Sequence, residues 1–336
     1  MTAASPAGNL AASPAMGAAR PNTIRMLWVT ASWGGCFLAI RWGLRDAPVL
    51  WFAALRALVA GVALFGYAAV RRRSFRVPRR VWPTVAALTV TNATLAFAAM
   101  FAGVAGLATG TAAVLANAQP LLIVLPAWWL YREAINATTV AALVVGFVGL
   151  LVVAIPGGGG QGAVQSLGAA AAITAGTLLA RRLAGTEVVV VAAWHFLVGG
   201  VLLAGWAGAA EGAPAITWTL RFVLALAFLS LIGTAAAFVA WFTESQHASL
   251  TQLAAWTFLV PVVGIALAAI VLGERPAGWT AAGVGIVFVS LWFVIHPRTQ
   301  RVSSRVIDRG GREEPVLETR VRGRGRWSAR VPRTRP

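Results

Sequence analysis

Long apolar runs separated by short polar loops cover the chain from about residue 26 to residue 296. Each run holds roughly 17 to 25 residues, which as a helix is long enough to cross about 30 Å of hydrocarbon. The runs are continuous and rich in Ala, Leu and Gly, and they lack the alternating period of a membrane barrel strand. The pattern predicts an all-α integral membrane protein with ten transmembrane helices, at 26–44, 48–70, 82–101, 107–131, 135–155, 166–183, 187–209, 219–242, 249–272 and 277–296.

Composition agrees with a membrane location. The chain is 59% hydrophobic and only 11% charged, too few charges to form an ordinary solvated surface. The first apolar run has no small-residue cleavage site after a short core, so we read it as a retained span. Cys36 is the only cysteine, which excludes a disulfide framework and a cysteine metal cluster. We expect no cofactor.

Arginine distribution predicts the orientation. All 28 basic residues are Arg, and most of them lie in the two ends and in alternate loops; the exceptions are Arg41, Arg45, Arg56, Arg221 and Arg275. The positive-inside rule then places both termini in the cytoplasm and the protein in the cytoplasmic membrane. Residues 1–25 and 297–336 are predicted to be disordered tails. The Arg-rich second tail favours contact with anionic lipid, and no nucleic-acid-binding motif is present.

One stretch of the chain is written twice. The matching residues lie 141 positions apart in four pairs: Pro120 and Pro261, Glu133 and Glu274, Phe97 and Phe238, and Phe101 and Phe242. A single offset for all four indicates an internal duplication. Five spans per copy is an odd number, so the second copy enters the membrane upside down. The sequence therefore predicts two inverted five-helix repeats, 26–155 and 166–296, an architecture associated with alternating access.

Several short motifs resemble a known family. They are Trp33-Gly34-Gly35 and Arg41 in the first span, Phe52-Ala-Ala-Leu-Arg56 in the second, and a Pro followed thirteen residues later by Glu in the fourth and ninth. With ten spans in two halves, residues 26–296 are similar to EamA-type permeases of the drug/metabolite transporter superfamily. The resemblance implies an inner-membrane exporter of small metabolites, often amino acids or their relatives. The substrate varies widely within that family.

Two prolines and four polar side chains are candidates for a midplane site. Pro120 and Pro261 each remove a backbone donor, which should kink the helix and leave polar backbone against a cavity. A kink that only shapes packing is the plainer alternative. Asn92, Asn117, Gln119 and Gln252 each need a partner in hydrocarbon. Substrate contact is the preferred interpretation for Asn117 and Gln119, whereas an interhelical hydrogen bond explains Asn92 equally well.

Aromatic and thioether side chains accompany the prolines. The candidates for the cavity wall are Trp33, Phe97, Met100, Trp241 and Trp256, although packing or lipid contact is the commoner role of aromatic residues in spans. An apolar cavity with a few polar groups would suit hydrophobic amino acids or amphipathic metabolites.

Three ionisable residues are candidates for a charge or proton role. Arg56 lies well inside a span, at a cost on the order of 3 kcal/mol on insertion scales, so it must meet water, carbonyls or an anion. A structural brace is favoured over a substrate carboxylate. His195 corresponds to Arg56 in the second repeat and could carry a proton, although a packing role is favoured. Glu244 ends the eighth span, where an ordinary solvated charge is the plainer interpretation.

We expect a secondary transporter, not an enzyme, that exports a small metabolite. The sequence contains no phosphate-binding loop motif, so ATP-driven transport is disfavoured. A channel-like facilitator is the main alternative, and an intramembrane enzyme is less favoured because no buried nucleophile with a base is found. Proton coupling is left open, and so is a homodimer built on the glycine-rich helix faces.

Overall fold

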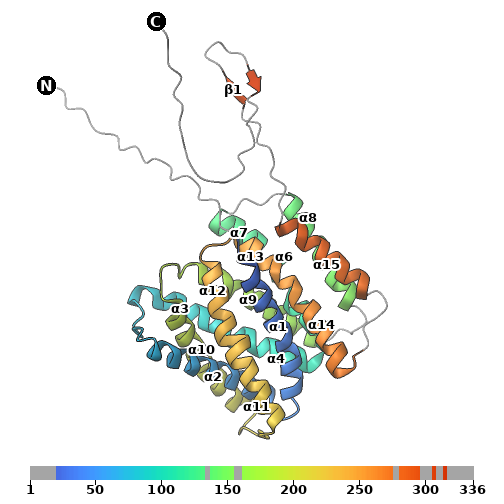
Figure 1. Ribbon diagram of the computed structural model, residues 1–336. Helices are drawn as coiled ribbons and strands as arrows, with labels where there is room; N and C mark the ends of the chain where they lie inside the picture. Colours follow the sequence, from blue (N-terminus) through green and yellow to red (C-terminus); the bar gives the residue numbers. More distant parts are fainter. Residues whose placement is uncertain are drawn as a thin grey trace, which may run out of the picture. The chain divides into compact units, whose positions relative to one another are not determined.

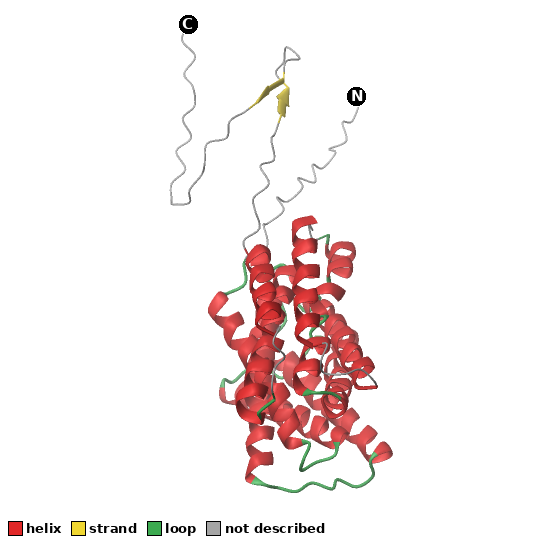
Figure 2. Cartoon of the chain, turned by 90° about the vertical axis from the view of Figure 1, so that its right-hand side faces the viewer, coloured by secondary structure: helices red, strands yellow, loops and turns green. Residues whose placement is uncertain are grey.

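The computed structural model describes residues 20–132, 137–154, 161–274, 280–295, 305–307 and 313–315. Most of the two predicted tails, and the loop that contains Glu133, lie outside the described residues. The chain forms two compact units, residues 1–297 and residues 298–336. The first unit is a bundle of helices (Figures 1 and 2).

The first half of the bundle begins with two uninterrupted helices, α1 (Thr23–Gly43) and α2 (Val49–Val70). The next helical run joins η1 (Arg79–Val81), α3 (Trp82–Leu88), the π-helix η2 (Thr89–Leu95) and α4 (Ala96–Gly106). A broken run follows, made of α5 (Thr109–Ala116), α6 (Gln119–Leu122) and α7 (Val124–Tyr131). Helix α8 (Ala137–Ala154) ends this half.

The second half has the same order of elements. It begins with α9 (Gln161–Arg181) and α10 (Val188–Ala210). The next run joins α11 (Leu220–Ala227), the π-helix η4 (Phe228–Ala236) and α12 (Ala237–Ser245). Then come α13 (Leu250–Ala255), the 3-10 turn η5 (Trp256–Phe258), α14 (Leu259–Leu272) and finally α15 (Thr280–Ile295).

Membrane-spanning capacity is found in seven of the described helical runs. They are long and apolar enough to cross a bilayer: Thr23–Gly43, Val49–Val70, Arg79–Gly106, Gln161–Arg181, Val188–Ala210, Leu220–Ser245 and Leu250–Leu272. Many of their apolar side chains face outward, including Val201 at 59% exposure and Leu224 at 60%. Such outward apolar faces are expected where lipid replaces water as the solvent. The helical membrane fold predicted from the sequence is therefore confirmed.

Polar caps mark where three of the helices begin. The Asn22 side chain accepts a hydrogen bond from the backbone N–H of Arg25, and Thr219 and Ser249 cap α11 and α13 in the same way. These side chains satisfy amide groups that the first turn of a helix leaves without partners. At the other end of α14, Gly273 takes the left-handed conformation, φ 68°, that commonly ends a helix.

Glycines allow the closest helix contacts. A Cβ atom on Gly61 of α2 would lie 2.6 Å from the backbone nitrogen of Leu197 in α10. A Cβ on Gly200 of α10 would lie 2.7 Å from Cγ of Leu58 in α2. Helices α2 and α10 form one packed pair, and α8 and α15 form another at the opposite flank of the bundle, with α1 between the two pairs (Figure 1). Small residues bring the helix backbones together at these contacts.

Residues 298–336 contain a short two-stranded ladder. Strand β1 (Arg305–Ile307) pairs antiparallel with β2 (Glu313–Pro315), with Arg305 opposite Pro315. The sequence pattern predicts disorder throughout this tail and gives no sign of the ladder. Two strands of this length have no apolar period long enough to be recognised in a sequence.

Candidate functional site

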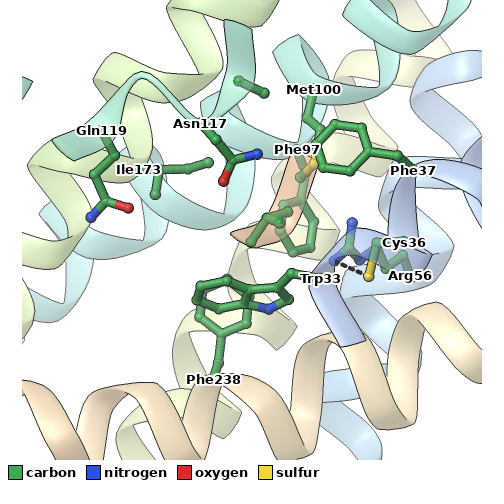
Figure 3. A pocket seen from close by; sticks show the side chains of 12 residues that line it. Trp33, Cys36, Phe37, Arg56, Phe97, Met100, Asn117, Gln119, Ile173 and Phe238 are labelled. Carbon is green, nitrogen blue, oxygen red and sulfur yellow. Dashed lines mark hydrogen bonds between the residues drawn. The ribbon is translucent and has the colours of Figure 1, made fainter. Parts of the chain in front are cut away.

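A cavity of about 50 Å³ lies inside the bundle, between helices of both halves (Figure 3). Its wall is mostly apolar, with one cation, one thiol and two amides. The lining residues are Trp33, Cys36, Phe37, Arg56, Phe97, Met100, Ala116, Asn117, Gln119, Ile173, Phe238 and Val260. Six of them were predicted as candidates from the sequence: Trp33, Arg56, Phe97, Met100, Asn117 and Gln119.

One face of α1 supplies a quarter of the wall. Trp33, Cys36 and Phe37 have the i, i+3, i+4 spacing that puts side chains on one side of a helix. The indole Nε1 of Trp33 donates a hydrogen bond to the carbonyl of Gly233, 3.1 Å away. The Trp33 ring also packs on Phe238, with centroids 5.4 Å apart. A hydrogen bond and a ring contact together fix the orientation of this indole at the cavity.

Arg56 is the only charged residue among the described residues of the cavity wall, and it is 1% exposed. Its Nε donates to Oγ1 of Thr234 at 2.8 Å, and its Nη2 lies 3.8 Å from Sγ of Cys36 and 3.5 Å from the carbonyl of Gly233. The guanidinium carbon lies 4.3 Å from the centre of the Phe97 ring. Among the described residues, Nη1 has no hydrogen-bond partner.

The π-helix η4 places the acceptor for Arg56. The wider turn of a π-helix shifts the backbone hydrogen bonds by one residue, and such segments are common at functional sites. Here the Thr234 hydroxyl donates to the carbonyl of Leu229, five residues earlier, at 2.7 Å. That hydroxyl therefore presents its oxygen lone pairs to Nε of Arg56, while Nη2 lies near Cys36 and Gly233, and Nη1 has no hydrogen-bond partner among the described residues.

The break between α5 and α6 supplies the amides. Asn117 follows the last residue of α5, and its backbone N–H bonds to Val114, so the carbonyl of Ala113 is free to accept from another donor. The Asn117 side chain takes that place, with Nδ2 2.7 Å from the Ala113 oxygen. Gln119 instead donates from Nε2 to Oγ1 of Thr177 at 2.8 Å. In Figure 3 these two amides lie on one side of the cavity, and Arg56 lies on the other.

The prolines lie beside the wall but not in it. Pro120 is the second residue of α6 and follows the lining residue Gln119, so the predicted interruption does occur at this position. Pro261 follows the lining residue Val260, but α14 continues through it, and the irregular turn is the 3-10 segment immediately before α14. Both prolines are buried. The two halves therefore interrupt this span in different ways.

Four other candidates are located elsewhere in the bundle. Asn92 is buried in η2, where its side chain occupies the space that a Cβ on Gly176 would need. Trp241 packs behind Trp33, with ring centroids 5.0 Å apart. Trp256 is buried in η5, and Gln252 lies half-buried in the first turn of α13. None of the four lines this cavity. A role in binding remains a prediction for each of them.

Neither His195 nor Glu244 lines the cavity. His195 is fully buried in α10, with Nδ1 3.2 Å from the carbonyl of Ala192 and its ring 3.9 Å from the Phe196 ring. Glu244 is 8% exposed, and it accepts a hydrogen bond from Nη1 of Arg25 at 2.5 Å and another from the backbone N–H of Asn22. The plainer sequence interpretation of Glu244, a solvated loop charge, missed this ion pair.

Ion pairs join the same two helical runs at both of their ends. Arg25 lies in the first turn of α1 and pairs with Glu244 at the end of α12. Asp46, which follows α1, pairs with Arg221 at the start of α11, with Nη2 and Oδ2 2.8 Å apart. We call these pairs the Glu244 clasp and the Asp46 clasp. About 30 Å of helix separates the two ends of α1, so the cavity lies between the clasps.

Sequence reasoning missed six wall residues: Cys36, Phe37, Ala116, Ile173, Phe238 and Val260. Two available signals could have found three of them. Cys36 and Phe37 follow Trp33 at helical spacing, and Phe238 corresponds to Phe97 in the duplicated stretch. Ile173 has no comparable signal, because an apolar residue in an apolar helix does not indicate which way it faces.

Membrane-spanning helices packed around an internal cavity with apolar and polar walls define a multi-pass membrane protein. Comparison with known proteins identifies which kind. The profile of the EamA-like transporter family matches residues 23–155 and again residues 160–296. The chain belongs to this family, as its motifs predicted, and is a membrane transporter rather than an enzyme.

Individual relatives agree with this assignment. The chain is 28% identical over 273 residues to the uncharacterized transporter YvbV of Bacillus subtilis, covering 77% of this chain and 89% of the relative. It is 26% identical to a probable amino-acid metabolite efflux pump of Escherichia coli, covering 81% of this chain and 94% of that protein. A solved crystal structure superposes with a TM-score of 0.69 at 21% identity, covering 81% of this chain and 95% of the other, and so shares its fold.

Proposed function

We propose that this transporter exports a small metabolite, an amino acid or a related compound, across the cytoplasmic membrane by alternating access. The observation that carries the proposal is the small internal cavity of about 50 Å³ between the two halves, with an ion-pair clasp toward each end of α1. Pockets that hold drug-sized ligands measure roughly 300 to 1,000 Å³. A substrate would therefore bind in a more open conformation, and this compact one corresponds to a step between its two openings.

The proposed architecture is ten spans in two inverted five-helix repeats, 26–155 and 166–296, with the cavity at their interface. Reciprocal contacts support it. Gly61 meets Leu197 and Gly200 meets Leu58, and each residue of α10 lies 139 positions after its counterpart in α2. Contacts that exchange in this way are typical of two copies related by a two-fold axis. An axis in the membrane plane would invert one repeat relative to the other.

The proposed orientation has both termini in the cytoplasm. The arginines support it, because those in the loops 71–80 and 181–182 and in the end segments share one side of the predicted topology. In this orientation the Glu244 clasp closes the cytoplasmic end and the Asp46 clasp closes the outer end. The arginines of residues 297–336 would then lie beside the anionic inner leaflet.

The site chemistry and the relatives support the proposed substrate class. The wall offers aromatic and aliphatic surface with few polar groups, which suits a small amphipathic molecule. The similar protein of Escherichia coli is named a probable amino-acid metabolite efflux pump. We extend amino-acid-related substrates to this chain on those two grounds.

Metabolite profiling followed by counterflow tests the proposal. Cells that overproduce the protein should accumulate at least one extracellular metabolite relative to cells that carry an empty vector. Proteoliposomes preloaded with that compound should then take up its labelled form faster than unloaded ones, and the flux should saturate. Flux that neither saturates nor responds to preloading would indicate a channel, and an unchanged extracellular profile would contradict export. The same vesicles with an imposed pH gradient test proton coupling.

A further inference from the structure

Arg56 carries a charge that its surroundings do not neutralise. The described residues place no carboxylate beside it, and the ion pairs among them join other arginines near the helix ends. A buried charge is expensive unless it is paired and fully hydrogen-bonded. Here a hydroxyl, a carbonyl and the thiol accept hydrogen bonds from Nε and Nη2, and the Phe97 ring faces the guanidinium. Nη1 is buried and bonds to none of the described residues.

We propose that Arg56 is the anion-recognition group of the cavity and that the transported molecule carries a carboxylate, which Nη1 binds. This inference rests on the transport function proposed above and names the chemical class of its substrate. A guanidinium matches the flat geometry of a carboxylate, and a charge-assisted hydrogen bond in a dry cavity is stronger than a neutral one. Binding the anion would also supply the missing countercharge, so the empty site and the bound site differ in their electrostatics.

The contacts of Arg56 act as a mount that leaves one nitrogen for the ligand. Thr234 accepts from Nε at 2.8 Å, and Gly233 and Cys36 occupy Nη2 at longer distances. A purely structural brace would be expected to use its nitrogens on protein acceptors. The described contacts use two of them and leave the third, Nη1, without a hydrogen-bond partner among the described residues. Thr234 is thus a positioning residue, which acts on the substrate through the orientation of Arg56.

The other polar wall residues are weaker partners for a carboxylate than Arg56. Asn117 uses one of its two amide N–H groups on the Ala113 carbonyl. Gln119 uses one of the two N–H groups of Nε2 on Thr177. The N–H that each amide keeps is neutral, and a neutral donor forms a weaker hydrogen bond with a carboxylate than a charged guanidinium does. Among the described wall residues Arg56 is therefore the group best suited to an acid, and the apolar rings would hold the rest of the molecule.

Matched probe pairs test the inference on purified full-length protein. The probes are leucine, phenylalanine and 4-methylpentanoate. Each is compared with its primary amide, in which an uncharged amide group replaces the carboxylate. One readout is the rise in melting temperature, and a second is protection of Cys36, which touches Arg56, from N-ethylmaleimide. We expect at least one acid to raise the melting temperature and to slow labelling of Cys36 about tenfold or more, while its amide does neither. Equal effects of an acid and its amide, or no effect of any acid, would overturn the proposal.

Variants separate recognition from bracing. Arg56→Met should remove the acid effect on melting temperature, and Arg56→Lys should weaken it because an ammonium lacks the planar fork. Thr234→Val should also weaken the acid effect on melting temperature, whereas Thr234→Ser, which keeps the hydroxyl acceptor, should retain it. Arg73→Met is the matched control, since Arg73 pairs with Glu187 away from the cavity. If Arg56→Met fails to fold, the wild-type acid and amide pairs and the two Thr234 variants still decide the question.

Failure of this inference is distinguishable from failure of the transport proposal. Acid-selective binding by the purified protein without counterflow in vesicles would support the Arg56 site and contradict the carrier. Counterflow of a compound that lacks an acid group, undiminished in Arg56→Met, would support the carrier and reject the carboxylate site.

Discussion

The thiol of Cys36 lies 3.8 Å from Nη2 of Arg56, and both side chains line the cavity. The only cysteine of the chain is therefore next to Arg56, the one charged side chain that the described part of the chain contributes to the cavity wall. Any event that changes access to this cavity, or fills it, should change the reactivity of this thiol. The wild-type protein consequently carries its own reporter for the site.

Alkylation of Cys36 should block transport. N-ethylmaleimide would add a bulky group to a cavity of about 50 Å³, leaving no room for a substrate. We expect treated proteoliposomes to lose most of their counterflow activity. The Cys36→Ala variant should transport at a rate within a few-fold of the wild type and should resist the reagent. Inactivation of Cys36→Ala at the wild-type rate would contradict the position of this cysteine in the transport pathway.

Each clasp should control access to the cavity from one side of the membrane, the Asp46 clasp from outside and the Glu244 clasp from the cytoplasm. Removing one partner of an ion pair that is partly buried costs about 1 to 3 kcal/mol, between the values for exposed and buried pairs. Asp46→Asn should therefore make Cys36 react roughly tenfold faster with a membrane-impermeant thiol reagent added outside intact cells. Glu244→Gln should give the corresponding increase in inside-out vesicles. The orientation of the clasps follows from the proposed topology.

The control for the clasps is Glu187→Gln. Glu187 pairs with Arg73, but the Glu187 side chain is 45% exposed, against 10% for Glu244 and 5% for Asp46, so the pair should contribute little. Its Cys36 reactivity should match the wild type from both sides. Increased reactivity of Asp46→Asn only from the cytoplasmic side would reverse the proposed orientation, and no change in either clasp variant would reject the clasps as gates.

A carboxylate introduced at position 117 should act as a built-in competitor. Asn117→Asp loses the donor to Ala113 and places a negative charge in the same cavity as Arg56, where little water screens their attraction. Asn117→Ala loses the same donor without adding charge. We expect the KM for an acidic substrate to rise at least tenfold more in the Asp variant than in the Ala variant. Equal KM values in the two variants would show that a charge at position 117 does not interact with Arg56.

The helical fold could be predicted from the sequence because the bilayer demands helices wherever apolar runs of sufficient length occur. Local irregularities were harder. Pro120 does interrupt its helix, but Pro261 lies inside α14, because the preceding 3-10 turn already frees the backbone that proline would disrupt. The π-helices η2 and η4 have no proline or glycine pattern that distinguishes them from ordinary helix. Packing against neighbouring helices determines such segments, and a single sequence does not record it.

The site was predictable where its residues differ from their surroundings. Arg56 and Asn117 are unusual inside apolar spans, so their chemistry alone identified them. The apolar wall was only partly predictable, since inward and lipid-facing residues are chemically alike. The partner of Glu244 could not be predicted, because Arg25 lies 219 positions away and the pairing depends on how the two halves assemble.

The reciprocal glycine contacts between α2 and α10 predict a specific pattern of stability. In Gly61→Ala the added methyl would lie 2.6 Å from the Leu197 backbone, so the helices must separate and lose packing. Gly200→Ala meets the side chain and backbone of Leu58 at 2.7 to 2.9 Å. Overpacking of this kind typically lowers the free energy of unfolding by about 1 to 3 kcal/mol. Both variants should melt several degrees below the wild type in detergent.

Each helix contains its own matched control. Gly66 in α2 and Gly205 in α10 have nothing within 4 Å of the position that a Cβ would occupy. Alanine at either site adds no clash and raises helix propensity by about 1 kcal/mol, so these variants should melt at or above the wild-type temperature. If the contacts are related by a two-fold axis, Gly61→Ala and Gly200→Ala should also reduce transport to a similar degree, because both disturb one shared crossing. A loss confined to one of them, with the other as stable and active as its control, would contradict the reciprocal arrangement.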